Sequence, residues 1–337
     1  MEFSHLASRL ASCDITSCLI HRGDELLFQY EREKGASREL LPINSCTKSV
    51  LSALVCIAMD KGLLPGPDTP AGDFFPVLLR DPDGRKRRIT LRHLLNLTAG
   101  FRWQEFGGIR SFPKMTRSPD WIQYVLGQPM AHEPGAVWTY NSGVSQLLAG
   151  ILAQAAGETI ARFAEQHLFG PLGIERYEWP SDPQGIHTGG FGLKLTAHDL
   201  LRFGLLYLRQ GMREGQVVVP RGLLLESVKP AAAARPPERG WYGWHWWADE
   251  IVAEIEATKQ PPSPREAGRA DRAVTAGRRV PYHYARGFGG QFVFVAPDVD
   301  AVVVFTRKTQ NRCLAPHTLF REAILPALAG GSLSPDE

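Results

Sequence analysis

A serine and a lysine three residues apart, Ser45 and Lys48, begin a stretch whose apolar residues recur with the period of a helix. Residues at this spacing are neighbours on a helix, so the amine of Lys48 should lie beside the hydroxyl of Ser45. A serine becomes a nucleophile when a base takes its proton, and a lysine can be that base if burial lowers its pKa. Asn44 is a favoured N-cap type and would place Ser45 in the first turn, where backbone N–H groups stabilise an oxyanion.

The same spacing also arises by chance, about once in a chain of this length at ordinary residue usage. A second copy, Ser111 to Lys114, contains Pro113 and is followed by no apolar period, so we interpret it as a coincidence. For the first copy, catalysis and coincidence stay open until partner residues are found elsewhere in the chain.

Tyr140 is a candidate partner, because it follows a Pro-Gly turn and precedes an apolar helix predicted over about 144–156. A tyrosine at such a junction is usually a packing residue with one hydrogen bond. In the functional interpretation it takes the Ser45 proton and passes it to the leaving group. A phenolate needs a lowered pKa, and we expect a nearby Lys48 ammonium to supply the positive charge.

Two further stretches are expected to border the site. Glycines 287, 289 and 290 would weaken a strand unless a ligand or backbone must come close, so this edge could offer a backbone N–H to a substrate carbonyl. The aromatic run 241–247 is expected to pack one face into the core. Its other face, with Trp244, is a candidate lining for an apolar substrate pocket.

The elements that position these residues follow from periodicity and turn signals. Helices are predicted over 1–11, 45–61, 90–97, 119–127, 144–156, 157–168, 196–210 and 315–328. Strands are predicted over 282–295 and 301–306, and residues 18–30 are two short strands around a Gly-Asp turn. Residues 64–88 and 101–118 are predicted loops, and 254–280 a mobile excursion between two strands.

Composition is that of an ordinary globular protein, with 44% apolar residues, 22% charged residues and a net charge of +3. This charge does not suggest nucleic acid, and the basic runs 85–88 and 265–279 are interpreted as solvated loops. No apolar run could cross a bilayer, no secretory signal is visible, and the five cysteines lack metal-type spacing. We therefore expect a cytoplasmic protein with reduced thiols, without a metal or other cofactor and without a membrane or nucleic-acid partner.

Together the motifs resemble those of serine hydrolases of the class C β-lactamase type, which include penicillin-binding-protein-like esterases and 6-aminohexanoate-dimer hydrolases. The matching pieces cover nearly the whole chain, and their order and spacing are more specific than any one of them. They are Ser45-Cys46-Thr47-Lys48, then 89–95 with 98–100, Pro134-Gly135 with Tyr140-Asn141-Ser142, 168–174, Gly192-Leu193 with Asp199-Leu200, Tyr242-Gly243, and 287–291.

The resemblance implies an α/β (α+β) fold, in which an antiparallel sheet is flanked by helices. Residues 1–75 and 190–337 would form the sheet domain, and 76–189 an inserted, mainly helical subdomain, with the active site at their junction. The resemblance also implies that Ser45 is the nucleophile and that Lys48 and Tyr140 handle its proton. The two oxyanion donors would be the backbone N–H groups of Ser45 and Phe288.

The chain departs from β-lactamases in two motifs. Ser142 stands where the tyrosine motif of β-lactamases has asparagine, and Gly287-Phe288-Gly289 replaces their Lys-Thr-Gly. The pair Lys308-Thr309 follows the last strand without a glycine and is interpreted as a decoy. The usual anchor for a β-lactam or D-alanyl carboxylate is therefore missing, although Arg286 could substitute. Ser142, Trp244, Gly289 and Gly290 are the expected substrate-binding residues.

The main hypothesis is a serine hydrolase that cleaves a small-molecule ester or linear amide (an esterase or amidase) through an acyl-enzyme on Ser45. One alternative is a non-catalytic binding or regulatory protein that keeps the fold, and another is a weak β-lactamase or D-alanyl peptidase. A further possibility is Cys46 as the nucleophile, but on a helix it would point about 100° away from Ser45. The oligomeric state and the acyl and leaving groups stay open.

Overall fold

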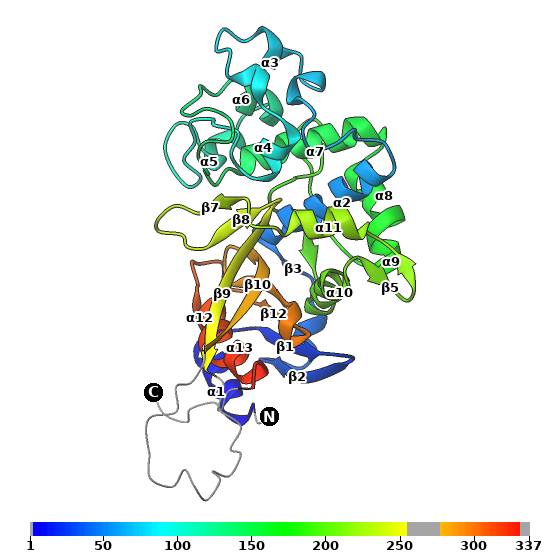
Figure 1. Ribbon diagram of the computed structural model, residues 1–337, viewed down its shortest axis with the longest axis vertical. Coiled ribbons are helices and arrows are strands. Elements are labelled where there is room, and N and C mark those ends of the chain that lie inside the picture. The colour runs from blue at the N-terminus through cyan, green and yellow to red at the C-terminus, as the bar shows by residue number, and fades with distance from the viewer. Residues whose placement is uncertain (1–2, 255–276, 331–337) are drawn as a thin grey trace, which may run out of the picture.

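The computed structural model describes residues 3–254 and 277–330. This part of the chain contains an eight-stranded sheet in the order β2-β1-β12-β11-β10-β9-β8-β7, and its register is antiparallel throughout. The strands are β1 Ser17–Arg22, β2 Glu25–Glu31, β7 Ala232–Ala233, β8 Trp241–Gly243, β9 Trp246–Glu254, β10 Gly277–Gly287, β11 Gln291–Ala296 and β12 Ala301–Thr306. Strand β1 pairs with β12, so the sheet joins the two ends of the sequence (Figure 1). The predicted antiparallel sheet is confirmed.

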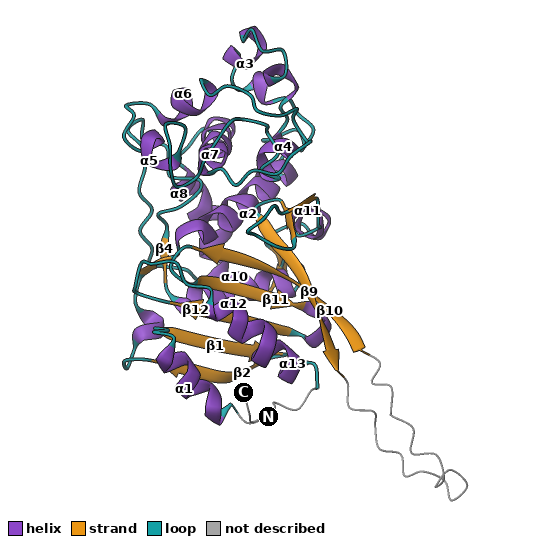
Figure 2. Cartoon of the chain, turned by 90° about the vertical axis from the view of Figure 1, so that its left-hand side faces the viewer, coloured by secondary structure: helices purple, strands orange, loops and turns teal. Residues whose placement is uncertain are grey.

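Helices cover both faces of this sheet, because successive side chains of a buried strand point to opposite sides. Val293 on β11 faces helix α10, where a Cβ added to Gly204 would lie 2.8 Å from it. The next residue, Phe294, stacks on Phe320 of the C-terminal helical segment with ring centroids 3.9 Å apart. Figure 2 shows α1, α12 and α13 in front of the sheet and α10 behind it. The prediction of flanking helices is therefore also confirmed.

Most helices come from the part of the sequence that lies between strands β2 and β8. The helices are α1 Ser4–Ser12, α2 Thr47–Asp60, α3 Val77–Arg80, α4 Leu91–Leu95, α5 Phe112–Met115, α6 Trp121–Leu126, α7 Ser142–Ala156, α8 Ile160–Ala164, α9 Gly170–Leu172, α10 Ala197–Leu208, α11 Arg221–Ser227, α12 Ala315–Leu319 and α13 Leu325–Leu328. Figure 1 shows α3, α4, α5 and α6 grouped at one end of the molecule, with α2 and α7 beside them. The division into a sheet domain and a helical subdomain stays a prediction.

Two small strand pairs complete the architecture. Strand β3, Leu41–Pro42, pairs with β4, Lys194–Leu195, immediately before the segment that carries Ser45. Strands β5, Met212–Arg213, and β6, Gln216–Val217, form a hairpin after α10. The β3–β4 pair fixes the position of the chain shortly before helix α2 begins.

Helix α2 is buried on every side from Thr47 to Ala58, more completely than its predicted single apolar face implied. It lies between the helical end of the molecule and the sheet (Figure 1). A polar side chain on such a helix has little access to water and must find protein partners. This placement is what makes Lys48 a buried amine.

Strand boundaries near the glycines differ from the prediction. The single strand predicted over 282–295 is two strands, β10 and β11, joined by a turn at 288–290. Residues 277–280, assigned to the excursion, already belong to β10, and Glu254 ends β9. The rest of the predicted excursion, 255–276, lies outside the described residues. Because β10 pairs with β9 along its length, its first residues are extended even though they are rich in arginine.

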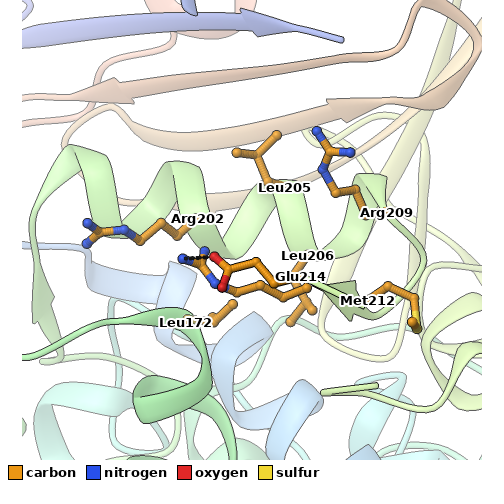
Figure 3. Close-up of a pocket in the computed structure, with 8 residues that line it drawn as sticks. Leu172, Arg202, Leu205, Leu206, Arg209, Met212 and Glu214 are labelled. Atoms are coloured by element: carbon orange, nitrogen blue, oxygen red, sulfur yellow. Dashed lines mark ion pairs between the residues drawn. The ribbon is translucent and has the colours of Figure 1, made fainter. Parts of the chain in front are cut away.

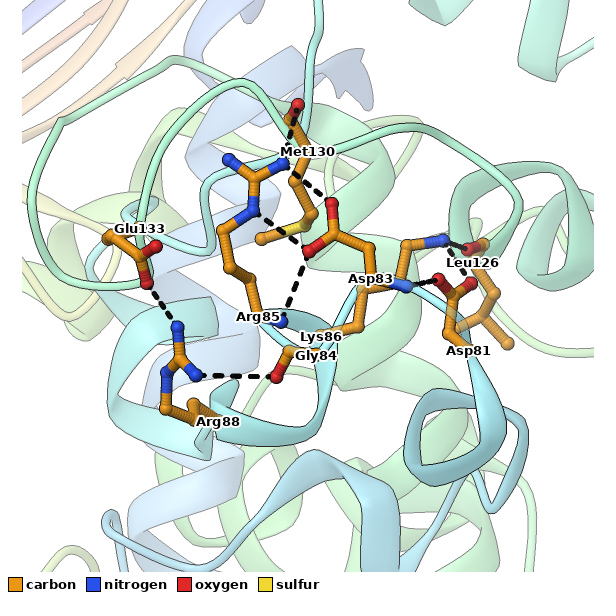
Figure 4. Close-up of polar contacts among 9 residues, drawn as sticks. All are labelled: Asp81, Asp83, Gly84, Arg85, Lys86, Arg88, Leu126, Met130 and Glu133. Carbon is orange, nitrogen blue, oxygen red and sulfur yellow. Dashed lines mark hydrogen bonds and ion pairs between the residues drawn. The ribbon is translucent and has the colours of Figure 1, made fainter.

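The basic run 85–88 is not simply a solvated loop. Lys86 is buried, and its ammonium donates hydrogen bonds of 2.7 Å to Asp81 and to the backbone oxygen of Leu126. Arg85 binds Asp83 through two side-chain hydrogen bonds, and Arg88 pairs with Glu133 (Figure 4). The run therefore ties the loop before α4 to the segments around α6 and the tyrosine motif.

The second Ser-x-x-Lys stretch forms the short helix α5, with proline near its start, where proline is tolerated. The side chain of Ser111 donates to Gly108 O, and Lys114 is exposed. The Ser111 hydroxyl is thus bound to the backbone, while the Lys114 side chain faces solvent. In the described residues no helix is long and apolar enough to cross a membrane.

Candidate active site

Ser45 lies in a 3-10 turn, η2 (Asn44–Cys46), that leads into α2. The prediction that Asn44 caps this helix is wrong, because Asn44 adopts a left-handed backbone with φ of 49° and its side chain makes no cap. Asparagine tolerates this conformation better than most residues. Its amide instead donates to Phe288 O (2.6 Å) and Gln310 Oε1 (2.7 Å), in and beyond the β10–β11 turn. The turn that carries Ser45 is thereby hydrogen-bonded to the turn between strands β10 and β11.

Lys48 lies beside Ser45 as the spacing predicts. Its side chain is buried, and Nζ donates to Ser45 Oγ (3.3 Å), Ser142 Oγ (2.9 Å) and Gly190 O (2.8 Å). Burial lowers the pKa of Lys48 to about 8, an effect that the nearby Glu105 carboxylate partly opposes. A Cβ on Gly190 would lie 3.2 Å from Nζ, so glycine leaves room for the amine. An amine with this pKa can accept a proton near neutral pH.

Tyr140 is also brought to this site, two residues before the Ser142 that Lys48 contacts. The Lys48 ammonium lies 4.7 Å from the centre of the tyrosine ring. Burial and the Glu105 carboxylate nevertheless raise the pKa of Tyr140 above its ordinary value, against the expectation that Lys48 would lower it. The lysine stands over the ring rather than at the hydroxyl, and burial outweighs the nearby charges. Tyr140 is therefore a phenol, and Lys48 is the group closer to its proton-accepting form.

Ser142 begins helix α7 and is buried next to Lys48. Its hydroxyl accepts from Lys48 and donates to a carboxylate oxygen of Glu105, and its backbone N–H donates to the other oxygen (2.9 Å). Trp103 Nε1 donates a third hydrogen bond to Glu105, at 2.7 Å. Sequence reasoning missed Glu105, because the loop 101–111 has no periodicity and only its folded path brings the carboxylate to α7.

The three glycines have different roles. A Cβ on Gly287 would lie 2.2 Å from Ile43 O, so this strand end meets the backbone next to Asn44. The close approach predicted for the glycines is thus to backbone. Gly289 and Gly290 have φ of 88° and 98°, as the turn between β10 and β11 requires, and an added Cβ would meet residues 307–316. Their positions favour a turn role over the predicted substrate binding.

Phe288 lies between these glycines and is 43% exposed, with its carbonyl held by Asn44. Its ring centroid is 6.0 Å from that of Phe106, which is 74% exposed in the loop next to Glu105. Both rings come from segments hydrogen-bonded to the neighbourhood of Ser45. They form an exposed aromatic pair beside the segments that carry Ser45 and Glu105. The role of the Phe288 N–H as an oxyanion donor stays a prediction.

Trp244 does not line this site. It is 1% exposed and packs under the guanidinium of Arg92, 5.9 Å away, so no surface is left for a substrate. The aromatic residue that meets the site is Trp247, whose ring stacks on Tyr140 with centroids 6.1 Å apart. Trp138 packs edge-on against Trp247, with an interplanar angle of 67°, and also contacts the Tyr140 ring. The prediction that Trp244 lines the site is therefore wrong, and Trp247 of the same aromatic run contacts Tyr140.

Three other candidates are engaged elsewhere. Arg286 pairs with Glu238 and lies 5.4 Å over the Trp247 ring, so its charge is already matched. Lys308 pairs with Glu39 at 2.8 Å, as a decoy would. Cys46 is buried with its thiol directed at Gln291 O, and burial raises its pKa. A thiol in this state is a poor nucleophile.

Cavities also occur elsewhere on the molecule. One of about 350 Å³ lies against α10 and is lined by Arg202, Arg209 and Arg213, the last paired with Glu214 at 3.2 Å (Figure 3). Another, of about 490 Å³, lies beside Trp241. Neither contains Ser45, Lys48 or Tyr140. In the described residues no cluster of three or more His, Cys, Asp or Glu side chains could hold a metal ion.

The sequence matches the β-lactamase family over residues 15–319. The protein belongs to the β-lactamase family. Its structure is similar to that of a Bacillus anthracis protein assigned as a 6-aminohexanoate-dimer hydrolase, with a TM-score of 0.73 and 16% identity over 96% of this chain and 81% of that one. It is also similar to EstCE1, a hydrolase with promiscuous acyltransferase activity, with a TM-score of 0.71 and 15% identity over 97% of both chains. At such identities the likeness shows the fold.

A relative in sequence is PbpX of Bacillus subtilis, assigned as a penicillin-binding protein. The two chains are 29% identical over 132 residues, which are 39% of this chain and 31% of PbpX. The match thus spans about a third of that relative's length. The predicted resemblance to β-lactamase-like and penicillin-binding-protein-like hydrolases is confirmed at the level of family and fold.

Proposed function

We propose that this β-lactamase-family protein is a serine hydrolase that cleaves a small-molecule ester or linear amide through an acyl-enzyme on Ser45. The observation that carries the proposal is the position of Lys48, a buried amine within hydrogen-bond distance of Ser45 and with its pKa lowered to about 8. Burial of a lysine without an ion-pair partner is unfavourable, and such lysines are found where a base is needed.

In the acylation step, Ser45 Oγ attacks the substrate carbonyl carbon while Lys48 accepts its proton. The resulting oxyanion is stabilised by the backbone N–H groups of Ser45 and Phe288. Tyr140, a phenol beside Lys48, donates its proton to the departing alcohol or amine and regains one from Lys48. Water then attacks the acyl carbon by the reverse route and releases the acid and free Ser45.

An ester or linear amide is favoured over a β-lactam because the carboxylate anchor is missing. Gly287 to Gly289 stand in place of the lysine motif, and Arg286 is neutralised by Glu238. The hydrolase names of structurally similar proteins support the same class. A cytoplasmic location stays a prediction.

The test is labelling and turnover of the purified protein. Wild type should react with a fluorophosphonate probe, hydrolyse a chromogenic short-chain ester and give an acyl adduct on Ser45 by mass spectrometry. Ser45→Ala should lose all three while Cys46→Ala keeps them. Undiminished hydrolysis by Ser45→Ala would overturn the assignment.

A substrate panel separates the alternatives. Esters, linear amides and a chromogenic cephalosporin are compared by kcat/KM. Faster reaction with the cephalosporin would favour a β-lactamase instead. Ligand binding without any Ser45 adduct would favour a non-catalytic binding protein.

A further inference from the structure

We propose that Glu105 is a positioning residue, which acts through the Ser142 hydroxyl to direct the lone pair of Lys48 at Ser45. The inference rests on the proposed function, because it assigns a partner to the proposed base. It concerns a carboxylate that no motif in the sequence singles out.

The carboxylate of Glu105 is held in one orientation. Trp103 Nε1 and the backbone N–H of Ser142 donate to one oxygen, at 2.7 and 2.9 Å, and the Ser142 hydroxyl donates to the other. Both oxygens of a carboxylate only accept hydrogen bonds. The single hydroxyl proton of Ser142 is therefore committed to Glu105.

This commitment decides what Ser142 offers to Lys48. With its proton directed at Glu105, the hydroxyl oxygen can only accept from Nζ, which lies 2.9 Å away. The other short contact of Nζ, at 2.8 Å, is to Gly190 O, and a backbone carbonyl can only accept. Both short contacts therefore require an N–H from the lysine.

A neutral lysine amine has two N–H bonds and one lone pair. If the two N–H bonds are directed at Ser142 and Gly190, the lone pair is left for the third neighbour, Ser45 Oγ at 3.3 Å. That is the orientation in which the amine can accept the serine proton. Without a carboxylate at position 105, Ser142 can rotate and donate to the lone pair, and the base is then turned away from Ser45.

The charge of Glu105 has a second, separable effect. The charged and titratable groups around Lys48 are Glu105, Cys46, Tyr140 and His245, with Arg286 beside the tyrosine. Of these, Glu105 is the main group that raises the pKa of Lys48 against burial. Removing its charge should therefore lower this pKa, so the acid limb of the acylation rate should move to lower pH. Loss of packing would hydrate Lys48 and move the limb to higher pH.

The experiment measures the acylation rate of the full-length protein with a neutral ester as a function of pH. Glu105→Gln should lower the plateau by roughly 10²-fold and shift the acid limb downward. Glu133→Gln is the matched control, because it removes an exposed carboxylate paired with Arg88. Melting temperatures and circular dichroism of all variants show whether each is folded.

A double-variant cycle tests the route through Ser142. In the Ser142→Ala background, Glu105→Gln should leave the plateau unchanged, because the hydroxyl that it orients is gone. Independent, multiplicative effects on the plateau would overturn the proposal, as would an acid limb that stays or rises in Glu105→Gln. These outcomes are read while wild type still forms the Ser45 adduct, so they are distinct from failure of the proposed function, in which Ser45→Ala stays active.

Discussion

The side-chain amide of Asn44 donates a hydrogen bond of 2.6 Å to the backbone oxygen of Phe288, 244 positions later in the chain. One end of this bond is the residue before the candidate nucleophile, and the other is the turn proposed to supply an oxyanion donor. The two halves of the site are therefore held together by a side chain in a left-handed backbone conformation.

Replacing Asn44 should separate these halves. Asn44→Gly keeps the left-handed conformation but loses the hydrogen bonds to Phe288 and Gln310, each worth about 0.5–1.5 kcal/mol. Asn44→Ala loses the bonds and adds roughly 1 kcal/mol of backbone strain. We expect lower kcat/KM in both variants and a lower melting temperature for alanine than for glycine. Wild-type turnover by the glycine variant would show that the bond is unimportant.

Activity should depend on pH through Lys48. Only the neutral amine accepts a proton, and with a pKa of about 8 the rate should rise with pH through that value and level off above it. Below it, each pH unit lowers the neutral fraction about tenfold. The measurement is kcat/KM with a neutral ester, with Ser45→Ala turnover subtracted as background. A flat profile across this range would exclude Lys48 as the base.

Tyr140→Phe should separate chemistry from packing. The ring contacts with Trp138 and Trp247 remain, and only the hydroxyl is lost. We expect kcat/KM to fall by roughly 10²–10⁴-fold with little change in melting temperature. Tyr177→Phe, which removes a hydroxyl bonded to Glu165, is the matched control. Equal effects of the two variants would count against a role in proton transfer.

The exposed aromatic pair of Phe106 and Phe288 should favour substrates with apolar acyl groups. Phe106→Ala should lower kcat/KM for a long-chain ester relative to an acetyl ester by roughly two- to tenfold, the worth of one aromatic contact. Val217→Ala, at an exposed position of β6, should leave the ratio unchanged. A ratio unaffected by Phe106→Ala would show that the acyl chain takes another route.

Lys86 should matter for stability and not for turnover. Lys86→Met removes the donor to the part-exposed carboxylate of Asp81 and to Leu126 O, and the loss of these hydrogen bonds should destabilise by about 1–3 kcal/mol. Arg87→Met, at an exposed neighbouring position, should change the free energy of unfolding by less than about 0.5 kcal/mol. Chemical denaturation compares them. Equal stabilities would mean that the buried ammonium is not anchored by these contacts.

The sequence predicts well what depends on local spacing. Ser45 and Lys48 are close because they are three apart at a helix start, and the Thr196–Asp199 capping box forms as its pattern indicates. The antiparallel sheet and its flanking helices are implied by the family resemblance, which rests on the order and spacing of the motifs.

What the sequence cannot predict depends on tertiary paths. Glu105 reaches Ser142 only because an irregular loop folds back over α7. Trp244 and Trp247 have the same residue type, and only the turn between β8 and β9 decides which one is buried under Arg92 and which one meets Tyr140. Side-chain type alone carries no information on that choice.

The contact of Gly287 with Ile43 has a consequence for how the protein loses its site. The end of strand β10, a long strand inside the sheet, packs directly on the backbone of Ile43, which leads into the turn that carries Ser45. No side chain separates the two backbones. Any movement of that turn away from the strand leaves a gap that nothing fills. We therefore expect hydrogen exchange to report one opening unit, in which the amides of β10 and those around Ser45 exchange together and never separately.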